Sequence, residues 1–166
     1  MAGALLHIES WRIHVLAIGL KAPVRWAGHS ESQIEVVLLD LRTSNGARGV
    51  SEMTVRPKWH GETTAGLVEA LNERLLPQLR DVDLHDQIAF IHTLSGETQS
   101  ALARALADMA REDILAQVAN LPLQDNMVRS APFASARDRP APASARFSCT
   151  ITRSDPQAMA QEAEYL

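Results

Sequence analysis

The Asn-Gly pair at Asn45 and Gly46 constrains this chain more than any other short feature. Asn-Gly is the pair most favoured in a two-residue type I′ turn, which needs positive φ at both central positions. It lies between two runs rich in β-branched and aliphatic residues, 33–43 and 48–54. We therefore predict an antiparallel β-hairpin at this point of the chain.

A third strand is predicted ahead of this hairpin, over residues 7–19. Apolar side chains occupy every second position of it, which is typical of a half-buried strand. The residues that share this face are Trp11, Ile13, Val15 and Ala17. Residues 21–30 contain Pro23 and Gly28 and are predicted to form the loop that leads into the next strand.

Helical periodicity begins after residue 63. Residues 64–79 carry leucines at helical spacing, and Pro77 is expected to disturb the last turn because it donates no N–H. The leucines of this stripe are Leu67, Leu71, Leu75 and Leu76. Strands come first and helices second, so the chain is predicted to be an α+β domain with a three-stranded antiparallel sheet followed by a small helical bundle.

Two more helices complete the predicted bundle. One covers residues 83–94, with Asp83 as its N-cap. The other is an Ala-rich helix over residues 98–120, whose composition has high helix propensity. The apolar faces are predicted to consist of Leu84, Ile88 and Ile91 in the first helix and of Leu102, Leu106 and Met109 in the second. Asp113 falls on the second face, where a structural hydrogen bond or salt link is expected because unpaired burial is costly.

The composition changes to Ala, Pro, Ser and Arg over residues 124–146, which predicts a flexible linker. A short β-prone run, 147–152, and a helix that begins at Pro156 follow it. The predicted organisation is therefore a folded domain over 1–123, a linker over 124–146 and a βα unit over 147–166.

Charge and hydropathy exclude several classes of protein. The formal net charge of the 166 residues is −4, and the arginines of the linker are sparse, so nucleic-acid binding is not expected. No apolar run approaches the roughly 18 to 20 residues of a membrane span. The start of the chain lacks the features of a signal peptide, and Cys149 is a single cysteine, expected to be an inert small hydrophobe. A cytoplasmic location is predicted.

Several patterns, in the same order, resemble one known family. Residues 41–52 are similar to its hairpin pattern T-x-d-G-x-x-G-x-G-E, although Ser51 stands where that pattern has Gly. Gly61-Glu62-Thr63 resembles its G-E-T opening of the first helix, 105–114 its long helix, 120–123 its closing g-l-P-l, and 149–160 its first barrel strand and helix. The chain thus resembles the mandelate racemase/muconate lactonizing enzyme family of the enolase superfamily, over residues 7–123 and 147–166.

The resemblance implies an N-terminal capping domain that closes over the mouth of a (β/α)₈ barrel. Such a barrel takes roughly 200 to 250 residues, so residues 147–166 are expected to be the first βα unit of a truncated barrel. The complete enzyme would abstract a proton next to a carboxylate while Mg²⁺ stabilises the enolate, as a racemase, cycloisomerase or dehydratase. Because the family's lysines and metal carboxylates lie on later barrel strands, no catalytic or metal-binding residue and no cofactor is assigned to this chain, which is expected to be inactive alone.

Two segments are the candidates for substrate specificity, by their position in the family's capping domain. The first, residues 23–30, offers Arg25, Trp26 and His29; the second, residues 54–60, offers Lys58, Trp59 and His60. An Arg or Lys facing a substrate carboxylate is physically reasonable. A small carboxylate substrate is expected only when a barrel is supplied. The alternative interpretation is that the two tryptophans cover the edge of the sheet and the charges are solvated.

Two other functions remain open from the sequence. The chain can be a non-catalytic interaction module that binds itself, a separate barrel or another protein through an exposed apolar face. It can also be a small-molecule binder that uses the two segments without a barrel. The six histidines show no pair at metal-binding spacing, so no metal site is predicted from them.

Overall fold

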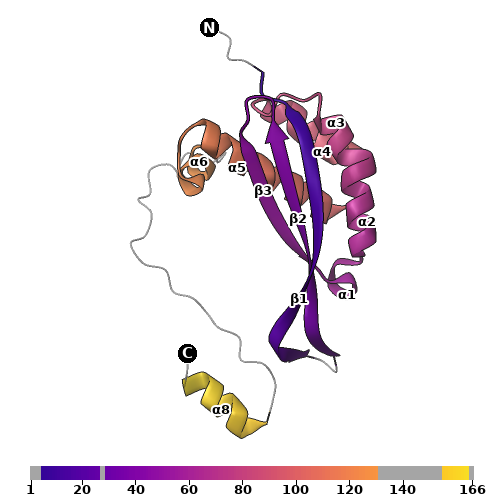
Figure 1. Ribbon diagram of the computed structural model, residues 1–166, viewed down its shortest axis with the longest axis vertical. Helices are drawn as coiled ribbons and strands as arrows, with labels where there is room; N and C mark the ends of the chain where they lie inside the picture. The colour runs from indigo at the N-terminus through magenta and orange to yellow at the C-terminus, as the bar shows by residue number, and fades with distance from the viewer. Residues whose placement is uncertain (1–4, 27–28, 131–154, 165–166) are drawn as a thin grey trace.

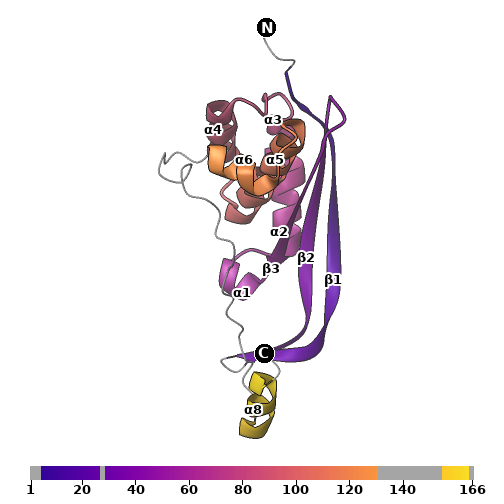
Figure 2. The ribbon, with the colours of Figure 1, turned by 90° about the vertical axis from the view of Figure 1, so that its left-hand side faces the viewer.

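Two layers make up the folded domain: an antiparallel sheet and a layer of helices on one of its faces (Figures 1 and 2). The structure is a computed structural model and describes residues 5–26, 29–130 and 155–164. The strands are β1 (Ile8–Trp26), β2 (His29–Thr43) and β3 (Arg48–Val55), in the spatial order β1-β2-β3. The predicted α+β architecture, with three antiparallel strands followed by helices, is confirmed.

The hairpin between β2 and β3 forms at the predicted place but with a different turn. Gly46 has a φ of +85°, whereas Asn45 is not among the described residues with positive φ, so the turn is not type I′. The Asn45 side chain instead accepts hydrogen bonds from the Thr43 hydroxyl (2.7 Å) and the Ala47 N–H (3.1 Å). These bonds stabilise a longer turn in which Gly46 alone is left-handed, a common type of hairpin loop.

The predicted loop over residues 21–30 is largely strand, which corrects the sequence interpretation. β1 continues to Trp26 and β2 begins at His29, with Val24 opposite Glu31 and Arg25 opposite Ser30. The register shifts between Gly19 and Val24. Pro23 is tolerated there because β1 is an edge strand and the irregularity removes the need for its missing N–H. The end of this long hairpin extends past the helical layer (Figures 1 and 2).

The predicted helix over residues 64–79 is continuous but changes its winding. It consists of α2 (Thr64–Glu69), a π-helical segment, η1 (Ala70–Leu75), and α3 (Leu76–Leu79). The predicted leucine stripe is confirmed, since Leu67, Leu71, Leu75 and Leu76 are all fully buried. The wide turn ends directly before Pro77, where the Leu76 N–H bonds the carbonyl of Leu71. Such a turn accommodates a proline that clashes with a regular α-helical turn.

Helix α4 (Gln87–Glu97) begins four residues later than predicted, and its buried face is different. Its N-cap is Asp86, which accepts a hydrogen bond from the Ala89 N–H (3.0 Å). Asp83 accepts bonds from the N–H groups of Leu6 and His85 instead. Phe90 and Leu94 are the buried residues of α4, whereas the predicted Ile88 and Ile91 are exposed. Of the predicted face Leu84 is fully buried, as expected, but it precedes the helix, which begins at Gln87.

Helix α5 (Ala101–Val118) packs on the sheet through small residues. Of the predicted face, Leu106 is buried, Leu102 is half-buried and Met109 is exposed. The buried residues of α5 are Ala103, Leu106, Ala107, Ala110, Arg111, Ile114 and Ala116. The helix lies close to Gly49 of β3, where the Ala110 carbonyl and the Ile114 side chain fill the space that a Cβ would need.

The predicted linker begins too early in the chain. Helix α6 (Leu123–Ser130) occupies its first residues and packs on α5. Buried Asn126 donates a hydrogen bond to the Glu112 carboxylate (3.0 Å), which joins α6 to α5. The rest of the linker, the β-prone run 147–152 and Cys149 lie outside the described residues. The predicted helix at Pro156 is confirmed as α8 (Pro156–Glu164), with Asp155 accepting from its first N–H groups.

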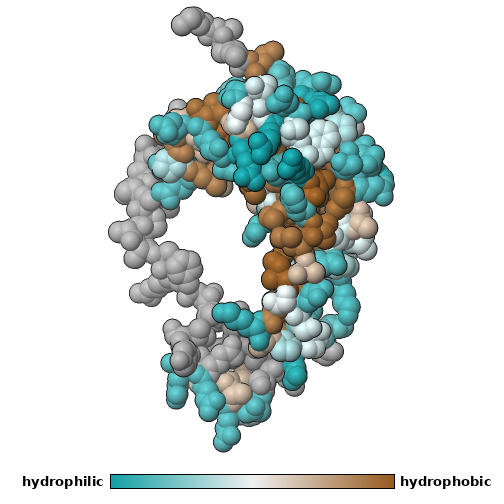
Figure 3. Space-filling view, in the orientation of Figure 1, coloured by the Kyte–Doolittle hydropathy of each residue, from teal (hydrophilic) through white to brown (hydrophobic). Residues whose placement is uncertain are grey.

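The face of the sheet opposite α5 carries exposed apolar side chains. In the view of Figure 3, which looks onto this face, an apolar patch crosses the middle of the sheet. Leu16, Ile18 and Val50 are its exposed large hydrophobic residues, by the alternation of the strands. Among the helices of the described residues, none is both long and apolar enough to cross a bilayer.

Candidate functional site

The far end of the β1–β2 hairpin meets the connection between β3 and the next helix. This connection contains α1 (Pro57–His60), a single turn that begins with a proline and ends at Gly61 in the left-handed region (φ +70°). Lys58 Nζ lies 2.9 Å from His29 Nδ1 of β2. The ammonium group is the donor in this contact, so His29 accepts through Nδ1. The two segments singled out in the sequence are therefore in direct contact.

Arg56 organises the β3 side of this site. Its guanidinium lies over the Trp59 ring, 4.7 Å from the ring centroid, and its Nε is 3.6 Å from a carboxylate oxygen of Glu31. Its backbone N–H donates to His60 Nδ1 (3.2 Å), which turns that imidazole toward the backbone. Cation–π stacking and the ion pair thus hold the α1 turn against β2. Arg56 and Glu31 were not singled out from the sequence, because no local pattern shows that 25 residues of separation bring them together.

A hollow of about 190 Å³ is lined by Glu31, Arg56, Pro57, Lys58 and Trp59. Glu31 is the single carboxylate in residues 23–31 and 54–60, against the cations Arg25, Arg56 and Lys58. The site therefore combines positive charge with an exposed indole, Trp59. Groups of this kind are chemically suited to hold an anionic group.

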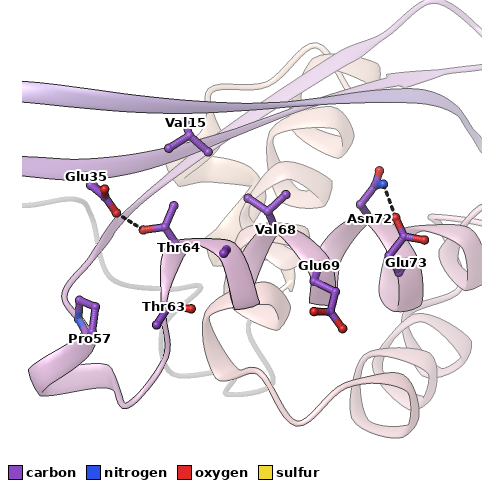
Figure 4. A pocket seen from close by; sticks show the side chains of 10 residues that line it. Val15, Glu35, Pro57, Thr63, Thr64, Val68, Glu69, Asn72 and Glu73 are labelled. Carbon is purple, nitrogen blue, oxygen red and sulfur yellow. Dashed lines mark hydrogen bonds between the residues drawn. The ribbon is translucent and has the colours of Figure 1, made fainter.

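A larger groove lies beside this hollow, between β1 and helix α2, and we call it the edge groove (Figure 4). Its volume is about 800 Å³. Val15 of β1 and Val68 of α2 point toward each other across it, and the Thr64 hydroxyl donates to the Glu35 carboxylate. Its lining residues are Val15, Glu35, Pro57, Thr63, Thr64, Ala65, Val68, Glu69, Asn72 and Glu73. Pro57 lines both hollows.

The predicted site residues have different placements. His29, Lys58 and Trp59 lie at the junction, and Arg25 is exposed on β1 opposite Ser30. His60 is exposed but bonded to the Arg56 backbone. The side chain of Trp26 lies outside the described part of the structure.

Two other sequence features have structural roles. Thr63 is the N-cap of α2 and accepts from the Gly66 N–H (3.1 Å), while Glu62 accepts from the Ser100 hydroxyl (2.7 Å) at the start of α5. Asp113 accepts from the Val50 N–H (2.9 Å), which confirms the structural hydrogen bond predicted for it.

Comparison with known proteins matches the part of the chain that holds the sheet and its helices. The sequence pattern described as "Mandelate racemase / muconate lactonizing enzyme, N-terminal domain" matches residues 10–127. The L-Lys-D/L-Arg epimerase of Desulforapulum autotrophicum is 30% identical over 115 residues, which cover 68% of this chain and 32% of that protein.

Solved structures of this group share the fold. A muconate lactonizing enzyme of Mycobacterium smegmatis complexed with muconolactone has a TM-score of 0.79 and 26% identity, covering 96% of this chain and 40% of that one. A dipeptide epimerase of Methylococcus capsulatus complexed with Mg and the dipeptide L-Arg-D-Lys has a TM-score of 0.66 and 25% identity, covering 74% and 34%. The chain thus spans about a third of the length of the curated relative that it matches.

Proposed function

The chain belongs to the mandelate racemase/muconate lactonizing enzyme family of the enolase superfamily, and from this premise we propose that its folded domain caps the active site of a catalytic barrel. The barrel is supplied either by further chain or by a separate polypeptide. We place the capping domain at residues 1–123 and add α6, because Asn126 is bonded to Glu112 of α5. The helix at Pro156 is assigned to the first βα unit of the barrel, over residues 147–166.

The contact between Lys58 and His29 supports a role in substrate specificity more than any other observation. It joins the two candidate segments at one end of the domain, beyond the helical layer (Figure 2). Arg25, Lys58 and Trp59 are exposed there. We propose that these side chains contact the part of a small carboxylate substrate that projects from the barrel, with a cation bonded to an anionic group.

The reaction itself is assigned to the barrel. As in the family, the complete enzyme would abstract a proton next to a carboxylate, and the named relatives point to an epimerase or another isomerase. Mg²⁺ would supply electrostatic stabilisation of the enolate in that enzyme. Among residues 5–26, 29–130 and 155–164, no group of three or more His, Cys, Asp or Glu side chains is placed to hold a metal ion. We therefore derive no catalytic step from this chain, and a cytoplasmic location stays a prediction.

The experiment is to join residues 1–130 to the barrel of the L-Lys-D/L-Arg epimerase, in place of its own cap, and to measure kcat/KM for dipeptides of different charge. Lys58→Ala and Arg25→Ala are expected to lower kcat/KM by about tenfold or more, mostly through KM, as expected for lost charge-assisted bonds. The matched control is Arg74→Ala, which removes an exposed arginine paired with Glu69 on η1. Equal effects of the three substitutions would contradict the proposed specificity role.

A barrel without any cap is the second control. If it turns over dipeptides as fast and as selectively as the fusion, the domain does not shape specificity. The alternative function, a non-catalytic interaction module, would then be favoured.

A further inference from the structure

Arg56 and Glu31 form the shielded part of the candidate site. The side chains of this ion pair are 26% and 30% exposed, and the Arg56 guanidinium also lies over the Trp59 ring. Trp59 is 59% exposed, and Lys58 is exposed as well. A ligand that approaches this end of the domain therefore meets Lys58 and Trp59 first, with Arg56 behind them.

The contact between Arg56 and Glu31 runs beside a second contact of the same kind. Lys58 Nζ lies 2.9 Å from His29 Nδ1. His29 and Glu31 are two residues apart on β2, so their side chains point to the same side of the strand. Arg56 and Lys58 are likewise two residues apart. Two neighbouring cations of one segment are thus matched with two neighbouring acceptors of the other.

Arg56 also holds the backbone of the α1 turn. Its carbonyl accepts hydrogen bonds from the N–H groups of Trp59 and His60 (both 2.9 Å), and its own N–H donates to His60 Nδ1. None of the four residues of α1 is buried, and a single helical turn is not stable by itself. These backbone bonds fix the path of the turn, whereas stacking on the Arg56 side chain orients the Trp59 ring.

We propose that Arg56 is a positioning residue for substrate specificity: its side chain holds Trp59 and Lys58 in the orientation that the substrate meets, and does not bind the substrate itself. This inference rests on the capping function proposed above. The Arg56 charge is already balanced by Glu31, so an anionic group of the substrate is left to the exposed cations. Side chains that are held in place before binding lose less conformational freedom when the substrate arrives.

The first experiment observes Trp59 directly by fluorine NMR of the 166-residue chain labelled with fluorotryptophan. Trp59→Phe identifies its resonance among those of the three tryptophans. Arg56→Ala is expected to move this resonance toward that of free fluorotryptophan and to narrow it, because the ring becomes mobile. Glu31→Gln should change it in the same direction but less, since the stacking remains.

Arg80→Ala is the matched control for this measurement. Arg80 is an exposed arginine that lies over Trp11, 5.5 Å from the ring centroid. Its replacement should shift the Trp11 resonance and leave that of Trp59 unchanged. Circular dichroism checks that each variant is folded.

The second experiment separates positioning from direct binding, in the fusion with the epimerase barrel. Arg56→Ala is expected to raise KM by about fivefold or more with little change in kcat. Lys58→Ala should then have a clearly smaller effect in the Arg56→Ala background than alone, because Lys58 is already misplaced there. A residue that bound the substrate independently would give losses that multiply.

An unchanged Trp59 resonance in Arg56→Ala, or losses that multiply in the fusion, would overturn the proposal. Failure of the capping function has a different signature. In that case Lys58→Ala leaves KM unchanged in the fusion, while the Trp59 resonance still responds to Arg56→Ala. That result would overturn the specificity role of Arg56 and leave its stacking as a structural contact.

Discussion

Gly49 of β3 lies so close to Ala110 of α5 that a Cβ built on Gly49 would be 2.2 Å from the Ala110 carbonyl oxygen. The same Cβ would be 2.7 Å from Cγ1 of Ile114. Neither neighbour can move independently, because the oxygen belongs to a helix backbone and Ile114 is fully buried. Sheet and helix therefore pack at a distance that only glycine permits at this position.

Gly49→Ala is accordingly expected to destabilise the domain by about 2 kcal/mol or more, the cost of an overpacked core. Urea unfolding monitored by circular dichroism measures the change. Gly19→Ala is the matched control: nothing lies within 4 Å of its Cβ position, so its effect should be within about 0.5 kcal/mol. A loss of the same size at both positions would show that the close approach is not the cause.

Ser51 departs from the glycine of the family's hairpin pattern, and its hydroxyl explains why the change is accommodated. It is buried and donates a hydrogen bond to the carbonyl of Leu106 (2.7 Å), which joins β3 to α5. Ser51→Ala is expected to lower the free energy of unfolding by about 1 kcal/mol. Ser44→Ala, at an exposed turn position, should change it little. If Ser51→Ala leaves the free energy of unfolding unchanged, the hydrogen bond to Leu106 makes no net contribution to stability.

Asp40 and Arg48 form a two-bonded ion pair, with Nε–Oδ1 at 2.8 Å and Nη2–Oδ2 at 3.1 Å. The hydrogen bond from Arg48 is the main cause that lowers the pKa of Asp40 below 3.8, against burial, which raises it. A carboxylate with a lowered pKa in the folded state stabilises the fold above its unfolded pKa. That contribution is lost as the pH falls through the folded pKa.

Asp40→Asn is therefore expected to cost up to about 1 kcal/mol near neutral pH, a value typical of partly exposed pairs. The difference from the wild type should shrink as the pH falls below about 4, the unfolded pKa of an aspartate. Thermal unfolding over a pH series measures it. Arg48→Met should destabilise the wild type but not the Asp40→Asn variant, and additive losses would contradict the pairing.

Ser100 has two partners at the start of α5. Its hydroxyl oxygen accepts from the Ala103 N–H (3.0 Å), and its O–H donates to Glu62 (2.7 Å). Ser100→Ala is expected to lower the free energy of unfolding by about 1 to 2 kcal/mol, because the N-cap of α5 and the hydrogen bond to Glu62 are lost together. Ser95→Ala, on the exposed side of α4, is the control. Glu62→Gln should lower the free energy of unfolding less than Ser100→Ala, because the amide oxygen still accepts the bond from Ser100. A larger loss in Glu62→Gln than in Ser100→Ala would show that the cap is unimportant.

Residues whose periodicity is carried by large side chains were predictable from the sequence. The leucines of residues 64–79 are buried as expected, and the strands on either side of Asn45 pair as expected. The face of α5 was assigned wrongly because the prediction followed Leu102 and Met109. Ala110 and Ile114 lie against Gly49 instead, and a sequence does not show how near another element lies.

The candidate site was predictable as two segments but not as one surface. Lys58 and His29 were singled out by their place in the family's pattern. Their contact depends on the β1–β2 pairing, which continues to Trp26 and His29. The turn signals in this segment, Pro23 among them, predicted a loop instead. The roles of Arg56 and Glu31 likewise depend on pairing between distant strands.

The projection of the β1–β2 hairpin past the helices has a consequence for how the chain tolerates substitution. The described residues from Gly19 to Gln33 lie apart from the hydrophobic core, so replacing them removes no core contact. Most changes there should leave folding intact while they alter charge and shape at the end of the domain. The segment can therefore accept substitutions with little loss of folded protein.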